Sequence, residues 1–225
     1  MGAPYFRAVL GSPTGGDVWR SRQTGGMDKA SVDSDPVAQL TRWLEAARSA
    51  DQTMPEAMAI ATATAEGRPS VRMVLLRGID QRGLVFYTDR ESDKGRELEA
   101  NPHAAALFHW FKPLHRQVRV TGAVEEVEDA LSDAYWRSRP SGSRRSAVAS
   151  RQSSVVKSRE ELEERTAALA EEFPDEADLP RPPRWGGYRV LPETVELWEE
   201  GPDRLHDRLR YRRHAGNWVL ERLSP

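Results

Sequence analysis

The C-terminal part of the chain carries a histidine between two arginines at even spacing: Arg204, His206 and Arg208. Side chains of a β-strand alternate between its two faces, so a strand here would put all three on one face. Two guanidinium groups and an imidazole on one face could bind an anionic ligand, and histidine titrates near neutral pH and can therefore move a proton. The same spacing also fits a solvated edge strand, because arginines are mostly exposed.

Other cationic positions repeat this theme at predicted strands and helix starts. Arg72 and Arg77 stand five residues apart, so in one strand they would face opposite sides of the sheet and could serve two different anions. Lys94 lies at the start of a predicted helix, where free backbone amides favour an anion. Gln117 could offer a donor and an acceptor to the edge of a heteroaromatic ring. Each signal alone also fits an exposed polar surface, but together they suit a ligand that bears phosphates, which the guanidinium fork binds well.

The spacing of other residue types argues against several alternative chemistries. The five histidines form no HExxH or similar compact set, so no metal site is predicted. The glycines form neither a Walker loop nor a dinucleotide fingerprint, and no Gly-x-Ser-x-Gly elbow is present. The acid pairs Glu125-Glu126 and Glu199-Glu200 stand among charged neighbours, which favours a solvated face over a catalytic dyad.

Short strands separated by turns must position these side chains. Residues 1–35 lack sustained periodicity and are expected to form a flexible leader, in which Met27 is a second possible start. Helices are expected to begin at Pro36, at Ser92 and at the capping box that Ser158 opens. Strands are expected at 57–64, 70–77, 84–88, 104–110, 117–127, 188–191, 194–198, 205–212 and 218–223. This pattern indicates a mostly β protein with helices, a small antiparallel barrel that forms one domain over residues 36–225.

Composition limits the class of protein. The chain has 225 residues, of which 38% are hydrophobic, enough for one substantial core. Its formal net charge of -2 gives no general reason to bind nucleic acid or a membrane surface. It contains no cysteine, which excludes disulfides and thiolate metal ligands. No apolar run of about 18 residues and no apolar signal-peptide core near the start are present, so a cytoplasmic location is expected.

Nine motifs occur in the order typical of one enzyme family. They are Arg72 to Arg77, Phe86-Tyr87-Thr88, Asn101-Pro102, Arg116-Gln117-Val118, Tyr135 with Ser138-Arg139-Pro140 and Ser143, Ala149 to Ser153, Trp185-Gly186-Gly187, Trp198, and Arg204 to Arg208. In these motifs, and over roughly residues 36–225, the chain resembles the pyridoxamine 5'-phosphate oxidase family. The resemblance implies a split β-barrel homodimer with flavin mononucleotide (FMN) bound at the interface between the subunits.

The resemblance also implies the residues of two neighbouring binding sites. FMN contacts are implied for Arg72, Met73, Val74, Leu75, Leu76, Tyr87, Thr88, Lys94, Gln117, Gln152, Ser153, Trp198 and Arg208. Substrate contacts are implied for Arg77, Tyr135, Arg139 and Ser143, which would cradle the phosphate of a small heteroaromatic substrate, and for Arg204 and His206 over its ring. We expect Arg204 and His206 to be the catalytic residues, which orient the substrate and handle its proton.

The implied reaction is the oxidation of pyridoxamine 5'-phosphate or pyridoxine 5'-phosphate to pyridoxal 5'-phosphate. The substrate's C4' carbon would pass a hydride to the flavin, and O2 would reoxidise the flavin and give H2O2. The hydride chemistry belongs to the flavin, while the protein supplies orientation and charge.

Several departures from the family pattern cluster around the substrate. Arg77 stands where the family generally has lysine, and Asp93 stands where many relatives have a basic residue. Ser146-Ala147-Val148 replaces Gly-Ala-Trp, Glu199-Glu200 follows Trp198 where Gln-Gly is common, and the leader lacks the family's Arg-x-x-Tyr lid. These changes leave the substrate and the affinity for FMN open.

Two alternative functions stay open, of which the first follows from these departures and the second from the barrel fold alone. The chain could be an FMN-dependent oxidase of the phenazine-biosynthesis type with another heteroaromatic substrate, or a non-enzymatic flavin-binding or tetrapyrrole-binding module. The phosphate cradle of Tyr135, Arg139 and Ser143 remains, which favours the vitamin B6 oxidase.

Overall fold

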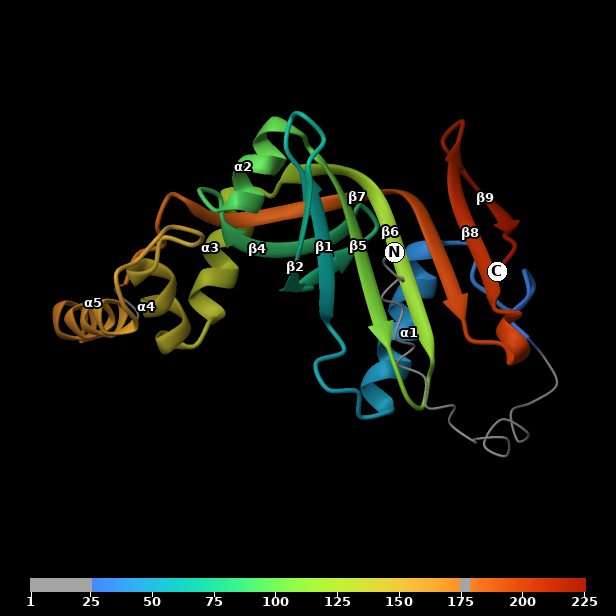
Figure 1. The fold of residues 1–225 in the computed structure, drawn as a ribbon, viewed down its shortest axis with the longest axis horizontal. Coiled ribbons are helices and arrows are strands. Elements are labelled where there is room, and N and C mark those ends of the chain that lie inside the picture. Colours follow the sequence, from blue (N-terminus) through green and yellow to red (C-terminus); the bar gives the residue numbers. More distant parts are fainter. Residues whose placement is uncertain (1–25, 175–178) are drawn as a thin grey trace, which may run out of the picture.

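One curled sheet dominates the computed structural model, which describes residues 26–174 and 179–225 (Figure 1). Nine strands in these residues pair in the order β2-β1-β5-β6-β7-β4-β3, while β8 pairs with β7 and β9. Every pairing is antiparallel. The strands are β1 (Ala57–Ala63), β2 (Pro69–Leu75), β3 (Gly78–Asp80), β4 (Gly83–Asp89), β5 (His103–Trp110), β6 (Arg116–Glu126), β7 (Trp185–Glu199), β8 (Asp207–His214) and β9 (Asn217–Arg222).

Five α-helices in the described residues surround the sheet: α1 (Pro36–Ser49), α2 (Asp93–Ala100), α3 (Asp129–Ser138), α4 (Ser141–Ala149) and α5 (Arg159–Glu172). Side-chain caps begin three of them, because the side chains of Asp35, Ser92 and Ser158 accept backbone N–H bonds from the first turns of α1, α2 and α5. Helices α4 and α5 lie at the end opposite the β8–β9 hairpin (Figure 1). No helix of the described ranges is long and apolar enough to span a membrane.

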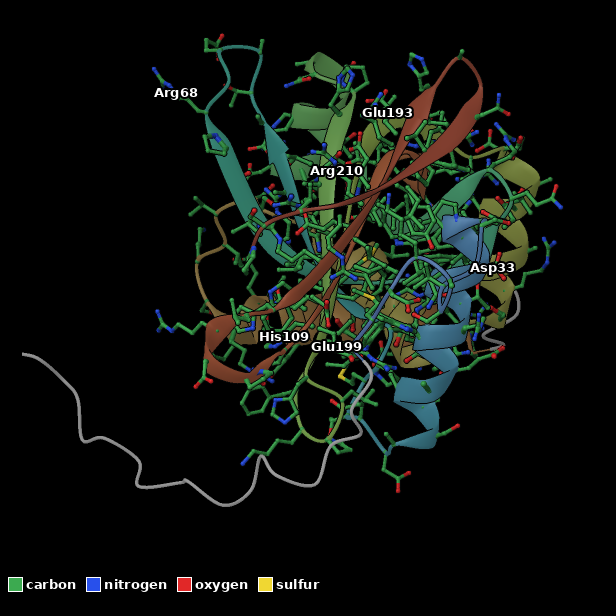
Figure 2. The ribbon with its side chains drawn as sticks, turned by 90° about the vertical axis from the view of Figure 1, so that its right-hand side faces the viewer. Asp33, Arg68, His109, Glu193, Glu199 and Arg210 are labelled. Atoms are coloured by element: carbon green, nitrogen blue, oxygen red, sulfur yellow. The ribbon has the colours of Figure 1, made fainter. Side chains whose placement is uncertain are left out.

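The core lies between the sheet and α1. Leu40 and Leu44 of α1 are 1% and 2% exposed and belong to one cluster with Phe108 and Tyr211 of the strands, both fully buried. The hydroxyl of Tyr211 donates to the backbone oxygen of Asp33, which lies just before α1 (Figure 2). The same cluster therefore fixes the position of β8 relative to α1.

The predicted strands 188–191 and 194–198 are one continuous strand, β7. Its first half pairs with β4 and its second half with β8, while β6 pairs along its length. Proline usually interrupts a strand. Pro192 lies opposite Gly122, where the β6–β7 register shifts between Thr121 and Gly122, and this irregularity in the pairing accommodates the proline within the strand. The prediction of a break was wrong for this reason. Figure 2 shows Glu193 and Glu199 toward the two ends of the half that pairs with β8, with Arg210 on β8.

The predicted strand 205–212 begins only at Asp207. Glu199 pairs with Asp207, so the intervening residues must form the connection between β7 and β8, and Arg204 lies in a 3-10 turn (Pro202–Arg204) with a left-handed φ of 64°. The prediction that Arg204, His206 and Arg208 share one strand face was therefore wrong. Likewise β2 ends at Leu75, so the strand alternation invoked for Arg72 and Arg77 does not reach Arg77.

Besides this 3-10 turn, one strand and two α-helices of the described residues were not predicted: β3, α3 and α4. Neither α3 nor α4 has a side-chain cap, which removes the signal that identified the other helix starts. The predicted leader falls outside the described residues up to position 25. Residues 26–35 are described, and there Met27 is 6% exposed, its N–H donating to Asp207 and its oxygen accepting from Arg222.

Replacing Gly122 with alanine tests the close approach of β6 and β7. A Cβ at this position would lie 1.8 Å from the backbone oxygen of Leu191, so Gly122→Ala is expected to lower the free energy of unfolding by about 1–3 kcal/mol. Gly142 in α4 has no heavy atom within 4 Å of such a Cβ, so Gly142→Ala is expected to raise it by about 0.5–1 kcal/mol. Urea unfolding of both variants measures the difference, and equal stabilities would contradict the strand contact.

Candidate active site

An open cavity of about 1290 Å³ is lined by residues from β2 and β4, the start of α2, and α3 and α4. It brings together most of the side chains predicted from the sequence: Arg72, Met73, Val74, Leu75, Arg77, Tyr87, Thr88, Lys94, Tyr135, Arg139, Ser143, Gln152 and Ser153. Leu76 is 4% exposed and belongs to the core instead. The cavity therefore contains all the residues predicted for the substrate phosphate and most of those predicted for FMN.

Lys94 is a buried cation on the wall of this cavity, 5% exposed. Its Nζ bonds to Gln152 at 2.7 Å, Thr88 at 3.2 Å and Ser92 at 3.3 Å, all neutral groups. Burial lowers the pKa of Lys94, and the nearby Arg72 lowers it further. A cation in such a position is energetically unfavourable unless an anion joins it.

Arg72 is fixed next to this lysine by a polar network. Its guanidinium pairs with Glu97 of α2 at 3.1 Å and also donates to the hydroxyls of Thr62 and Ser70. Both hydroxyls donate in turn to Glu97. Burial acts in the opposite direction, but these hydrogen bonds lower the pKa of Glu97 and keep it ionised. No feature of residue type or spacing distinguishes Glu97 from a solvated acid.

A second group of cations lies around Arg139, which lines the same cavity together with Arg77. Its guanidinium stacks over Trp185 at 4.8 Å and Trp136 at 5.5 Å, and one of its nitrogens, Nη1, is buried without a hydrogen-bond partner. Burial lowers the pKa of Arg139, and repulsion from Arg77 and Arg144 contributes. Among the described residues, none of these three arginines forms an ion pair with a carboxylate. The group is thus suited to an anion.

Stacked aromatic rings line the same cavity as the cations. Tyr87 stacks on Tyr135 with centroids 4.2 Å apart and on Trp185 at 5.5 Å. Arg77 lies over the ring of Tyr135 at 5.9 Å. Flat apolar surface next to cations is what an aromatic phosphoester requires.

The residues that depart from the family pattern have identifiable roles. Asp93 lines the cavity, but its carboxylate pairs with Arg96 at 2.5 Å. Glu199 pairs with Arg116 at 2.6 Å and Glu200 pairs with His115, so both hold the turn before β6. Neither Glu199 nor Glu200 lines the large cavity.

The remaining predicted cofactor residues lie in a separate groove of about 270 Å³. Gln117, Trp198 and Arg208 are neighbours in one row across β6, β7 and β8. His206 packs on Trp198 with centroids 4.7 Å apart, and its Nδ1 accepts the N–H of Gly201 at 3.2 Å. In the neutral ring Nε2 therefore carries the proton. Arg204 is exposed and lines neither cavity, so one chain does not assemble the complete predicted site.

The geometry defines a mostly β protein with two cationic sites in one aromatic cavity. Family models match residues 45–172 as "Pyridoxamine 5'-phosphate oxidase" and residues 185–225 as "Pyridoxine 5'-phosphate oxidase C-terminal dimerisation region". The chain belongs to the pyridoxamine 5'-phosphate oxidase family, a family of oxidoreductases. The predicted family and the predicted split-barrel fold are confirmed.

Relatives and solved structures agree with this assignment. A pyridoxine/pyridoxamine 5'-phosphate oxidase from Ralstonia pickettii is 50% identical over 93% of this chain and 98% of its own length. One from Salinibacter ruber is 50% identical over 88% of this chain and 93% of its own. The crystal structure of PhzG from Burkholderia lata, in complex with tetrahydrophenazine-1-carboxylic acid, has a TM-score of 0.81 and 38% identity over 86% of this chain and 94% of that one. A pyridoxamine 5'-phosphate oxidase-related, FMN-binding protein from Nostoc punctiforme shares the fold, with a TM-score of 0.66 and 21% identity over 84% of this chain and 96% of that one.

Lys94→Met tests whether the buried cation serves binding rather than stability. Without ligand, the variant is expected to be more stable than the wild type by roughly 1 kcal/mol, because a desolvated charge is removed. It should also lose affinity for FMN by at least about tenfold, which is one charge-assisted contact. Urea unfolding and FMN fluorescence titration measure both effects, with the exposed Lys112→Met as the matched control.

The pH dependence gives a second measurement on this variant. Because the pKa of Lys94 is lowered below 10.5 in the folded protein, the unfolded chain binds more protons between the lowered value and 10.5, and stability rises with pH in that window. Lys94→Met lacks this contribution, so its stability advantage should shrink as the pH rises. A constant difference would contradict the burial of an ionised lysine.

Proposed function

We propose that the protein is an FMN-dependent oxidase that converts pyridoxamine 5'-phosphate or pyridoxine 5'-phosphate to pyridoxal 5'-phosphate, with O2 as acceptor and H2O2 as product. The observation that carries this proposal is the presence of two cationic groups, around Lys94 and around Arg139, in one cavity. In each group the positive side chains outnumber the carboxylates that pair with them, so the cavity is suited to two anionic ligands side by side. A phosphorylated cofactor and a phosphorylated substrate meet this requirement.

The residues around Lys94 fit the phosphate of FMN. Lys94 has only neutral partners, and Ser153 and the N-terminal turn of α2 lie next to it. Arg72, Lys94 and Ser153 would hold the phosphate, while Gln117, Trp198 and Arg208 would meet the ring system. When bound, FMN supplies hydride acceptance and the transfer of electrons to O2.

A homodimer would complete the site. Gln117, Trp198 and Arg208 line a groove that is separate from the cavity of the same chain. We infer that the groove of one subunit faces the cavity of the other, with FMN at the interface. The match of residues 185–225 to a dimerisation region supports this arrangement, since these residues include β7, β8 and β9.

The cavity's own residues would bind and orient the substrate. Arg77 and Arg139 would hold its phosphate, and the stacked rings of Tyr87 and Tyr135 offer surface for a flat ring. His206 presents a proton at Nε2, because Nδ1 accepts the N–H of Gly201. In its neutral form His206 is therefore a hydrogen-bond donor to a substrate oxygen or nitrogen, and we assign it and Arg204 as the orienting and proton-handling residues.

A phenazine-type oxidase is the alternative that a specific observation favours. The PhzG structure binds tetrahydrophenazine-1-carboxylic acid, and a carboxylate could also pair with Arg77 and Arg139. Ser146, which stands where the family usually has glycine, lines the cavity. A dianionic phosphate uses the two arginines more fully than a single carboxylate does, which favours the vitamin B6 substrate.

A visible absorption spectrum tests the function directly. The purified protein is expected to be yellow, and anaerobic addition of pyridoxamine 5'-phosphate is expected to bleach the flavin band. Bleaching by a tetrahydrophenazine carboxylate but not by either phosphorylated vitamer would establish the alternative. Flavin-loaded protein that neither compound bleaches would support the non-enzymatic flavin module. For such a module, replacing Arg204 and His206 with alanine should leave FMN binding unchanged, whereas an oxidase should lose turnover.

Arg139→Gln tests the substrate phosphate site. Loss of one charge-assisted contact of about 1.5–3 kcal/mol is expected to raise KM for pyridoxamine 5'-phosphate by roughly 10–100-fold. FMN affinity should stay unchanged, because Lys94 and Arg72 form a separate group. Arg137→Gln removes the same charge from an exposed position in α3 outside the cavity. Equal KM values for the two variants would overturn the assignment of Arg139.

A further inference from the structure

A buried glutamate joins two arginines on the wall of the groove. The side chain of Glu196 in β7 is 8% exposed. One of its carboxylate oxygens accepts from Nε and Nη2 of Arg208 at 2.9 and 2.7 Å, and the other pairs with Arg119. Of the seven residues that line the groove in the described part of the chain, Glu196 is the one acidic side chain.

The sheet register explains how Glu196 reaches Arg208. Gln117, Trp198 and Arg208 form one cross-strand row, and Glu196 pairs with Arg119 in the neighbouring row on the same face. Side chains two residues apart on a strand project from the same face, and long ones contact diagonal neighbours across strands. The guanidinium of Arg208 is therefore held by a residue that lies beside Trp198 rather than opposite Arg208.

The contact with Glu196 fixes the position of the Arg208 guanidinium and sets the net charge of the groove wall. Among the described residues, the guanidinium of Arg208 makes one further hydrogen bond, to the backbone oxygen of Ser224 at 2.8 Å, so its other side-chain contacts are those with Glu196. The side chains of Arg119 and Arg208 bring two positive charges, and Glu196 brings one negative charge. The three side chains thus present a net single positive charge to whatever occupies the groove.

We propose that Glu196 is a positioning residue that orients Arg208 toward the FMN ring and sets the charge next to that ring. The inference rests on the proposed function, since it takes the groove's ligand to be the flavin. Reduction adds electrons to a flavin, so extra positive charge nearby favours the reduced form. Glu196 consequently keeps the flavin's reduction potential lower than the two arginines alone would set it.

A charge cycle tests this role through the midpoint potential of the bound flavin. Glu196→Gln leaves two uncompensated arginines and is expected to favour the reduced form by roughly tenfold, which is about 30 mV for a two-electron couple. Arg119→Gln removes one positive charge and should shift the potential in the opposite direction. The double variant restores the net charge and should return close to the wild-type potential. Spectroelectrochemical titration of the FMN-loaded proteins measures all four.

Glu221→Gln is the matched control. Glu221 in β9 also joins two arginines, Arg210 at 2.8 Å and Arg212 at 3.1 Å, but it does not line the groove. Its replacement makes the same change in net charge, and the potential should stay at the wild-type value. Equal shifts for Glu196→Gln and Glu221→Gln would overturn the proposal.

Further outcomes separate a structural role from the proposed one. If Glu196 served only stability, its variant would change the urea midpoint without opposite shifts in potential between the two single variants, and this would overturn the proposal. If Glu196→Gln does not fold, Arg119→Gln, at a side chain 55% exposed, decides the question alone, because an unchanged potential would refute it. Wild-type protein that binds no FMN would overturn the proposed function, whereas FMN-loaded proteins with identical potentials would overturn only the role of Glu196.

Discussion

The length of β7 is the constraint on which the arrangement of the site depends. This strand carries Trp185 at its first residue, in the large cavity, and Trp198 near its last, in the groove. At about 3.3 Å per residue, roughly 40 Å of strand length separates these two positions along β7, and the cavity and the groove share no lining residue. The same strand holds β4 and β6 at one end and β6 and β8 at the other. A fold built on it separates two half-sites rigidly, and a second copy can rejoin them.

Cations in the two half-sites fall into two physical kinds. Arg72 and Arg208 are each held by a nearly buried glutamate, Glu97 or Glu196, so they are oriented before any ligand arrives. Lys94 has no such partner and is desolvated by burial. The first kind provides fixed geometry, and the second provides unsatisfied charge that a phosphate can neutralise. The cavity and groove therefore combine preorganised arginines with a buried cation, Lys94, that favours ligand binding but lowers the stability of the ligand-free protein.

The sequence predicts the parts of the fold whose signals are local. The starts of α1 and α2 follow from Asp35 and Ser92, because a cap acts within one turn. The continuity of β7 through Pro192 does not follow, since the register shift that accommodates this proline forms only when β6 and β7 pair. Arg204 is a similar case: even spacing from Arg208 suggests one strand face, but pairing of Glu199 with Asp207 forces the intervening residues into a turn.

The candidate site shows the same division between local and spatial information. Residues such as Arg139 and Gln152 can be predicted because their motifs keep a recognisable order along the chain, and the fold places both in one cavity. Glu196 stands in an alternating strand like many surface acids, and its partner Arg119 is 77 residues away in the chain. Nothing in residue type distinguishes it from Glu193, which stays exposed in the same strand. Burial distinguishes them, because a carboxylate that loses water must gain cations. An acid that lies buried between two arginines in a groove where a ligand is expected therefore acts on those arginines before it acts on the ligand.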